Sequence, residues 1–533
     1  MRRFLRSWHT TLPSNIRASV RRTTSSRLFG NVSNASKFNG PGTLSFWYYA
    51  HTNVVHAASD ASFTAEGGDS IIDPDEPDAG TPEQWDHPLD TFVRRMFPVD
   101  ESATSLATAI QKLRDQEESH TFSTGQHIHA CQYASNYICE DAYTIGRFGT
   151  TSQPGEWYYW AIFDGHAGHA TSHLLARAFS PFMAQGLNEF ISPSRPYFPD
   201  DEEVHSRISE GFTALDAAIK LAAALALRDY PPADARAIRM MAPALSGSCA
   251  LSAFFDPAHS VLRIANIGDS RAVLGRFDDA KGAYVAHPLS TDHTGFNAGE
   301  VSRIRDEHPG EPDVIDPKTG RLLGIAVTRA IGDVRWKWND DEVSDLHKRF
   351  WGHKPRPAGV NKTPPYLSAK PEITETVVRN GARGDFLIMA SDGFWDLVGN
   401  EVAVEMVERW IEGKRKNIFL QRQGRDAGLE QRFDRPDDNM DTYYDEKEGL
   451  RWHVKPEHIV VEDDNAATHL IKNAFGGKRR NLFTGVMSIY PPLSRDVRDD
   501  VTVQVVFFGG FKAQPKDTMG RNTTANQVRN GRG

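Results

Sequence analysis

Aspartates stand at the ends of several apolar, strand-like runs in this sequence. Asp164 closes the run WYYWAIF, Asp392 follows FLIMAS, and Asp499 begins the acidic pair that precedes VTVQVVFF. A single aspartate at such a place commonly forms a turn with its own backbone. Several carboxylates gathered at one rim of a β core repel one another, and a divalent cation with oxygen ligands relieves that repulsion. The combination therefore predicts a site for hard cations.

The residues around these aspartates favour manganese or magnesium over zinc. Gly165 follows Asp164, and because glycine has no side chain its backbone carbonyl can approach an ion closely. The sequence has three cysteines, and none stands in the paired spacing of a zinc site. Two hard cations a few ångströms apart can hold a water, lower its pKa and clamp a phosphoryl oxygen for in-line attack. The predicted chemistry is hydrolysis of a phosphoryl group without a covalent enzyme intermediate.

Apolar runs and helical stretches surround these acids and must position them. The predicted strands are 156–164, 248–256, 261–270, 271–277, 385–393 and 500–508, and the predicted helices are 201–228 and 400–413. The strands within 248–277 are joined by short turns, which implies antiparallel pairing because a parallel neighbour needs a long crossover. Helices before and after them indicate packed antiparallel sheets that helices cover.

Bulk composition excludes some classes of function. The chain of 533 residues has a net charge of −9, which argues against a nucleic-acid binder that works by bulk charge. The apolar stretch LSFWYYA is too short to span a bilayer by itself, so we expect no transmembrane helix.

The composition changes along the chain and indicates separate parts. Residues 1–59 contain seven arginines and no acidic residue, which is typical of a mitochondrial transit peptide. The sign of the charge then changes, and Asp, Glu, Pro and Gly become frequent, as in a solvated linker. The predicted parts are a transit peptide with its adjoining segment (1–59), an acidic flexible linker (60–90), a catalytic domain (91–510) with surface-loop insertions at 335–365 and 414–460, and a disordered tail (511–533).

Eight stretches, taken in order along the chain, resemble the motifs of the metal-dependent protein phosphatases of type 2C. They are CEDAY (139–143), FDGHAGH (163–169), LSGSCAL (245–251), ANIGDSRAVL (265–274), LSTDHT (289–294), AVTRAIGD (326–333), FLIMASDGFWDLV (386–398) and RDDVTVQVV (498–506). Any one stretch is a weak signal, but eight in the family's order are specific. The resemblance implies an α+β fold, a four-layer α-β-β-α sandwich of two antiparallel sheets flanked by helices, and a protein serine/threonine phosphatase that uses metal-bound hydroxide.

The resemblance also implies two Mn²⁺ or Mg²⁺ ions per site, with a weaker third. In the family pattern Asp164 bridges the first two ions. The other implied ligands are Asp392 and Asp499 for the first ion, the Gly165 carbonyl with Glu140 and Asp141 through waters for the second, and Asp269 with Asp392 for the third. Asp500 stands where most relatives have asparagine, and its implied role is to support the ligands.

His166 is similar to the family's general acid, which protonates the departing serine oxygen. The alternative reading of His166 is a structural hydrogen bond to a nearby acid. Asn136 stands where typical members have an arginine that contacts the substrate phosphate. The phosphate must then be neutralised mainly by the metal ions or by another cation, and the sequence does not choose among Arg303, Arg305, Arg329 and Arg335.

A finer resemblance is to the pyruvate dehydrogenase phosphatase branch. Asn136, the doubled acid in RDD, and the stretches IGDVRWKW, PPYLSAKPEIT and NAATHLIKNAFGG carry it. It implies that the partners are the phosphorylated E1 alpha subunit and the core of the dehydrogenase complex, in mitochondria, with the matrix favoured and the intermembrane space left open. Two alternatives remain. One is a phosphatase of another mitochondrial phosphoprotein, and the other is a non-catalytic phosphatase-like binding module, which the intact metal aspartates disfavour.

Overall fold

The computed structural model describes residues 105–149, 155–415, 441–446 and 449–509. All of them belong to the larger of two units of the chain, which begins at Thr91. The predicted transit segment 1–59, the linker 60–90 and the tail 511–533 lie outside the described residues, as does 416–440 within one predicted insertion. Those assignments stay predictions.

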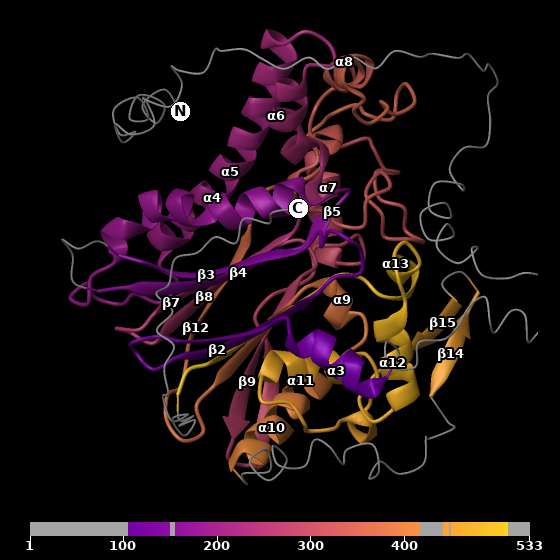
Figure 1. The fold of residues 1–533 in the computed structure, drawn as a ribbon. Coiled ribbons are helices and arrows are strands. Elements are labelled where there is room, and N and C mark those ends of the chain that lie inside the picture. The colour runs from indigo at the N-terminus through magenta and orange to yellow at the C-terminus, as the bar shows by residue number, and fades with distance from the viewer. Residues whose placement is uncertain (1–104, 150–154, 416–440, 447–448, 510–533) are drawn as a thin grey trace, which may run out of the picture. The chain divides into compact units, whose positions relative to one another are not determined.

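Two antiparallel sheets lie face to face in the described part of the chain (Figure 1). The six-stranded sheet has the order β1-β2-β16-β13-β9-β10, and the five-stranded sheet has the order β12-β8-β7-β4-β3. Their strands are β1 (Glu117–Thr121), β2 (His127–Tyr133), β3 (Ala142–Phe148), β4 (Trp157–Phe163), β7 (Ala250–Asp256), β8 (Val261–Ile267), β9 (Arg271–Asp278), β10 (Ala283–Pro288), β12 (Glu372–Val377), β13 (Phe386–Ala390) and β16 (Val501–Phe507). Smaller sheets are formed by β5 (Gly165–His166), β6 (Gly247–Ser248) and β11 (Ile331–Gly332), and by β14 (Thr442–Asp445) with β15 (Gly449–Trp452).

Strand β4 is apolar throughout because both of its faces are covered. Successive side chains of a strand point to opposite faces of the sheet. Trp160 and Ile162 lie in the apolar layer between the two sheets, whereas Tyr159 and Phe163 lie in the layer between the five-stranded sheet and the helices. All seven residues of β4 are buried. This packing fixes the backbone from which Asp164 projects.

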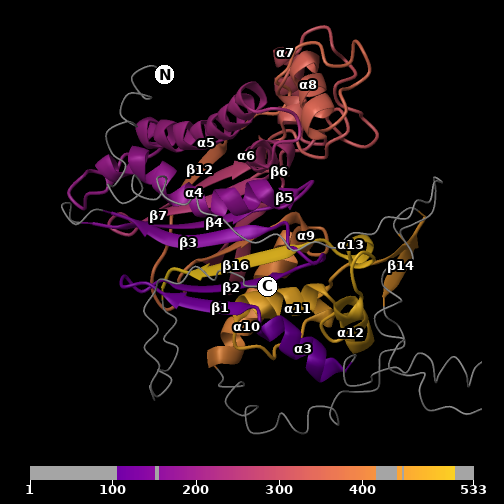
Figure 2. The same cartoon turned by 45° about the horizontal axis from the view of Figure 1, so that its top comes forward.

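Helices cover the outer face of each sheet, so that the described part has four layers (Figure 2). The helices that pack on the five-stranded sheet are α4 (Ala170–Leu187), α5 (Glu202–Asp229) and α6 (Ala235–Leu245). Those that pack on the six-stranded sheet are α3 (Leu106–Arg114), α10 (Asn400–Arg415), α11 (Ala466–Ala474) and α12 (Arg480–Ser488). Further helices are α7 (Ala298–Glu307), α8 (Asp340–Phe350), α9 (Asp392–Trp395) and α13 (Ser494–Val497). The predicted α-β-β-α sandwich is confirmed, and no helix of the described residues is long and apolar enough to cross a membrane.

The predicted strands and the two predicted helices are present, with ends shifted by a few residues. Both segments predicted as surface-loop insertions contain regular elements: the described part of 414–460 contains β14 and β15, and 335–365 contains helix α8. Its first turn is closed by a capping box between Asn339 and Glu342, and Val343, Leu346 and Phe350 bury its apolar face. The dense charge of the segment concealed these three apolar positions.

Candidate metal centre

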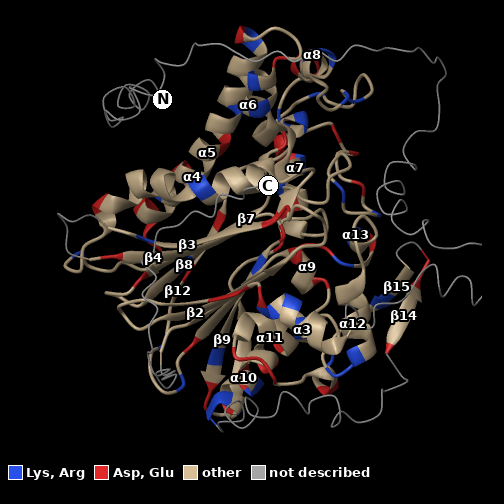
Figure 3. Ribbon diagram, in the orientation of Figure 1, with Lys and Arg blue, Asp and Glu red and all other residues tan. Residues whose placement is uncertain are grey.

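Acidic residues of both sheets meet where their strands end; Figure 3 marks the acidic positions in red. Asp164 follows β4 of the five-stranded sheet, and Asp392 follows β13 of the six-stranded sheet. Asp269 lies in the short turn that carries the chain from β8 to β9, and thus from one sheet to the other. The backbone N–H of Asp392 approaches Oδ2 of Asp164 at 3.5 Å. The predicted ligands therefore converge, although they are far apart in the sequence.

The carboxylates of the cluster are buried and close together, and both effects raise their pKa values. Burial first, and then the neighbouring carboxylates of Asp392 and Asp141, raise the pKa of Asp164 well above its ordinary value. Burial, followed by the charge of Asp392, raises the pKa of Asp269 to about 7. Burial also raises the pKa of Asp141 to about 7. Such a group of oxygen donors fits Mg²⁺ or Mn²⁺, because a bound cation offsets the repulsion that otherwise favours protonation.

Gly165 brings the loop of Glu140 against the end of β4. A Cβ at Gly165 would lie 2.2 Å from the carbonyl oxygen of Glu140 and 2.7 Å from Oγ of Ser172, so no side chain fits there. The Glu140 carboxylate accepts a hydrogen bond of 2.8 Å from the backbone N–H of Gly168. Gly165 and Glu140, both predicted ligands of the second ion, are thus neighbours.

Asp141 is fixed by hydroxyl groups of the opposite sheet. Its Oδ2 accepts hydrogen bonds from Oγ of Ser391 at 2.8 Å and from Oγ1 of Thr502 at 2.7 Å. The side chain is buried and links the start of β3 to β13 and β16. These contacts fix the position of one carboxylate oxygen of Asp141.

Asp500 supports the loop that carries Glu140. Its Oδ1 accepts from the backbone N–H of Ser135 at 2.5 Å and from Oγ of Ser135 at 2.8 Å, and its Oδ2 accepts from the backbone N–H of Glu140 at 2.6 Å. All three of these partners are hydrogen-bond donors. A carboxylate accepts hydrogen bonds through both of its oxygens, so Asp500 can pair with all of them.

We expect Asp500→Asn to loosen this loop. The amide would place an NH₂ group against the N–H of Glu140 and leave that buried donor without an acceptor, which costs ~1–3 kcal/mol of stability. Urea unfolding should show the loss, and calorimetry should show weaker Mn²⁺ binding. The exposed Asp306→Asn serves as the control and should change neither measurement. Unaltered unfolding and Mn²⁺ affinity in Asp500→Asn would contradict this role.

His166 pairs with an acid that the sequence did not single out. Its Nε2 lies 2.7 Å from Oδ2 of Asp333, and the two positions are 167 residues apart. Burial opposes protonation of His166, but the charge of Asp333 and the hydrogen bond to it prevail, so the pKa of His166 is raised. Asp333 itself is buried and anchored by its backbone N–H to the carbonyl of Ser246 at 3.0 Å. A hydrogen bond of this kind is what the structural alternative for His166 predicts. The raised pKa of His166 is also compatible with the role of a general acid.

Asp499 contacts an arginine that sequence reasoning missed. A guanidinium N–H of Arg495 donates to Oδ1 of Asp499, and Nη2 of Arg495 lies 3.9 Å from Oε2 of Glu140. The signal was available in the sequence, since the two residues are spaced i, i+4. Asn136 follows Ser135 on the same loop and is partly exposed.

Cys249 adds a thiol to the centre. Ligand atoms of Asp164, Asp269 and Cys249 lie within 4.8 Å of one another, and Sγ of Cys249 lies 3.2 Å from Oδ1 of Asp269. Burial and then the charge of Asp269 raise the pKa of Cys249 well above its ordinary value, so the thiol stays protonated. It acts as a hydrogen-bond donor to Asp269.

Comparisons with known proteins agree with this geometry. The sequence model of the protein phosphatase 2C family matches residues 126–433. A protein phosphatase 2C homolog of Schizosaccharomyces pombe is 36% identical over 71% of this chain and 79% of its own length. The chain belongs to the protein phosphatase 2C family. It is accordingly a protein serine/threonine phosphatase.

Other members of the family also match. The mitochondrial pyruvate dehydrogenase (acetyl-transferring) phosphatase 1 of Saccharomyces cerevisiae is 35% identical over 75% of this chain and 72% of its own length. Among solved structures, the serine-threonine phosphatase 2C of Toxoplasma gondii aligns with a TM-score of 0.39 and 16% identity over 72% of this chain and 95% of that one.

Proposed function

We propose that this phosphatase hydrolyses phosphoserine and phosphothreonine with two Mn²⁺ or Mg²⁺ ions, and that a weaker third ion binds beside them. The convergence of Asp164, Asp269 and Asp392 from both sheets is the observation that carries the proposal. Asp164 would contact both principal ions. The other proposed ligands are Asp392 and Asp499, the Gly165 carbonyl, Glu140, Asp141 and Asp269.

The proposed chemistry divides the work between the ions and the chain. When bound, the ions lower the pKa of a water and withdraw charge from the phosphoryl oxygens. His166 holds the proton that the departing serine or threonine oxygen takes up, and the hydrogen bond to Asp333 favours the protonated form of the imidazole by raising its pKa. Of the imidazole, 26% is exposed, so a substrate can reach it.

The proposed substrate is the phosphorylated E1 alpha subunit of pyruvate dehydrogenase, in the mitochondrial matrix. Two observations support it. A relative of 35% identity is a mitochondrial pyruvate dehydrogenase phosphatase, and residues 1–59 have the composition of a transit peptide. Another mitochondrial phosphoprotein is the second candidate, because the choice of substrate depends on surface segments such as 296–325 and 335–365.

We expect the purified protein to release phosphate from serine-phosphorylated E1 when Mn²⁺ or Mg²⁺ is present, and to stop when EDTA is added. Its kcat/KM for E1 should exceed that for an unrelated phosphoserine protein of similar charge by at least ~10-fold, since contacts outside the phosphate then contribute. Equal rates on both substrates would contradict the E1 proposal alone. Phosphate release undiminished in EDTA would contradict the metal mechanism.

A further inference from the structure

Arg495 lies on the short helix α13, at the rim of the carboxylate cluster. Its guanidinium donates to Asp499, lies 3.9 Å from the Glu140 carboxylate, and has Nη1 3.5 Å from Oγ of Ser135. About a third of the side chain, 34%, is exposed. The guanidinium is therefore in contact with the carboxylates and also partly open to solvent.

Arg495 bridges the proposed ligands of both principal ions. The two carboxylates that it contacts, Asp499 and Glu140, are proposed ligands of the first and the second ion. Asp392 follows β13 and Asp499 precedes β16, and because these neighbouring strands are antiparallel, both residues lie at the same edge of the six-stranded sheet. Arg495, which contacts Asp499, therefore lies at the edge that carries both proposed ligands of the first ion.

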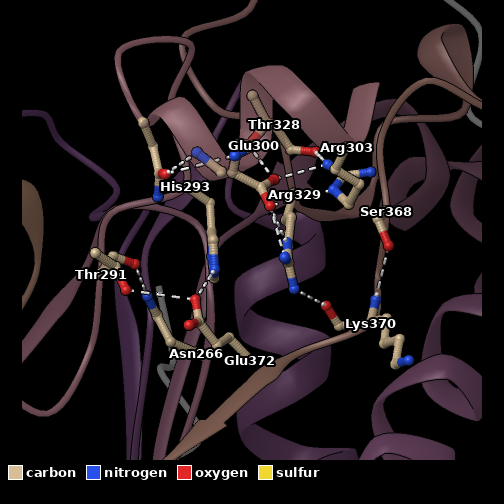
Figure 4. Close-up of polar contacts among 12 residues, drawn as sticks. Asn266, Thr291, His293, Glu300, Arg303, Thr328, Arg329, Ser368, Lys370 and Glu372 are labelled. Carbon is tan, nitrogen blue, oxygen red and sulfur yellow. Dashed lines mark hydrogen bonds and ion pairs between the residues drawn. The ribbon is translucent and has the colours of Figure 1, made fainter. Parts of the chain in front are cut away.

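The arginines that the sequence left as alternatives are engaged elsewhere. Arg303 and Arg329 both bind Glu300, with Nη2 of Arg303 at 2.7 Å from Oε2 and Nη2 of Arg329 at 2.6 Å from Oε1 (Figure 4). Thr328 donates to the same carboxylate at 2.6 Å. Removing either arginine from Glu300 would leave a buried carboxylate short of partners.

The other two alternatives do not face the cluster either. The guanidinium of Arg335 lies over the ring of Trp336, 5.6 Å from its centroid. Arg305 is exposed on the surface of α7. Within the described residues, none of the four alternatives forms a hydrogen bond or ion pair with a carboxylate of the centre, whereas Arg495 contacts two.

We propose that Arg495 binds the phosphate of the substrate and supplies the positive charge that Asn136 cannot. This rests on the proposed two-ion function. If the carboxylates of Asp499 and Glu140 held ions, the guanidinium N–H groups of Arg495 would be released from them and could bind a phosphate. Arginine suits this task because its planar fork can bind two phosphate oxygens together.

The position of Arg495 also explains how asparagine is tolerated at position 136. Ser135, which contacts Arg495, is the residue directly before Asn136. Arg495 thus brings a cation from α13 to the loop that lacks one. An arginine introduced at position 136 would deliver its charge to the same region from the loop itself.

The test compares the Mn²⁺-loaded wild type with Arg495→Ala and Arg495→Lys. Calorimetric titration with inorganic phosphate should give an affinity reduced by ~10-fold or more in Arg495→Ala, since a charge-assisted hydrogen bond is lost, and a smaller loss in Arg495→Lys. KM for phosphorylated E1 should rise in parallel. Arg305→Ala, with an exposed arginine remote from the cluster, is the control and should match the wild type.

A second variant separates phosphate binding from a structural role. Asn136→Arg added to Arg495→Ala should restore phosphate affinity, whereas a merely structural defect would persist. Mn²⁺ affinity of Arg495→Ala, measured by calorimetry, should equal or exceed that of the wild type because a competing cation is gone. Unchanged phosphate affinity, or a loss of Mn²⁺ affinity as large as the loss of phosphate affinity, overturns the proposal. A wild type that shows no Mn²⁺-dependent activity would instead overturn the proposed function.

Discussion

Asp164→Asn should lower kcat by at least ~10³-fold, because the proposed ions supply several kcal/mol of charge stabilisation and one residue contacts both of them. The amide has nearly the same shape as the carboxylate but carries no charge. Calorimetry should show Mn²⁺ binding weakened to a similar degree. The exposed Asp306→Asn is the matched control and should keep both properties.

The stability of the Asp164→Asn variant should change in the opposite direction. The pKa of Asp164 is raised by burial and by neighbouring carboxylates, so its charged form costs stability once the pH exceeds the pKa of an unfolded aspartate. Asparagine removes that cost. Without divalent ions the variant should therefore melt at a higher temperature than the wild type at neutral pH, and the difference should shrink as the pH falls.

Thermal melts with and without Mn²⁺ distinguish this account from simple misfolding. The wild type should gain stability from Mn²⁺ by mass action, and Asp164→Asn should gain little. A variant that is less stable than the wild type in EDTA would contradict the electrostatic argument. A variant that keeps the full Mn²⁺ response would contradict the ligand assignment.

Residues close in sequence to a buried strand could be placed from the sequence. Asp164 and Gly165 follow directly from β4, whose seven residues are all buried, so the end of the strand defines where the carboxylate emerges. Asp392 follows β13 in the same way. In each case an apolar run both predicts the element and locates the residue at its end.

Partners supplied by distant loops could not be placed in this way. Asp333 and His166 are 167 residues apart in the sequence. The small sheet in which β6 pairs with both β5 and β11 brings them together. Two-residue strands have no periodicity that a sequence can show. Arg495 was missed for a related reason, because α13 has only four residues and is too short to show a helical periodicity.

Two of the arginines that the sequence left as candidates for binding the phosphate are held by another residue. Arg303 and Arg329 stand close to family motifs, yet Glu300 of α7 binds both of them. Glu300 was not considered, since an acidic residue in a polar helix is normally solvated. Its burial depends on Thr328 and the loop before β11, which only the folded chain brings to α7.

Gly247→Ala should separate His166 from Asp333 and lower kcat by ~10²-fold, the usual contribution of a positioned general acid. A Cβ at Gly247 would lie 2.0 Å from Oδ2 of Asp333 and 2.1 Å from Nε2 of His166, between the two atoms that form the hydrogen bond. Asp333 is buried and its backbone is anchored, so the imidazole is the group that must move. Gly485→Ala, where a Cβ meets nothing within 4 Å, is the matched control.

The pH profile shows whether the loss arises from the acid. Asp333 raises the pKa of His166 against the effect of burial, so the protonated form that donates to the leaving oxygen persists to higher pH. Activity should fall as the pH rises through that pKa, and in Gly247→Ala the fall should come at lower pH. Asp333→Asn, which keeps the space but removes the charge, should shift the profile in the same direction, and both variants should bind Mn²⁺ like the wild type. If the profile keeps its position in both variants, His166 has a structural role and the proton must come from another group.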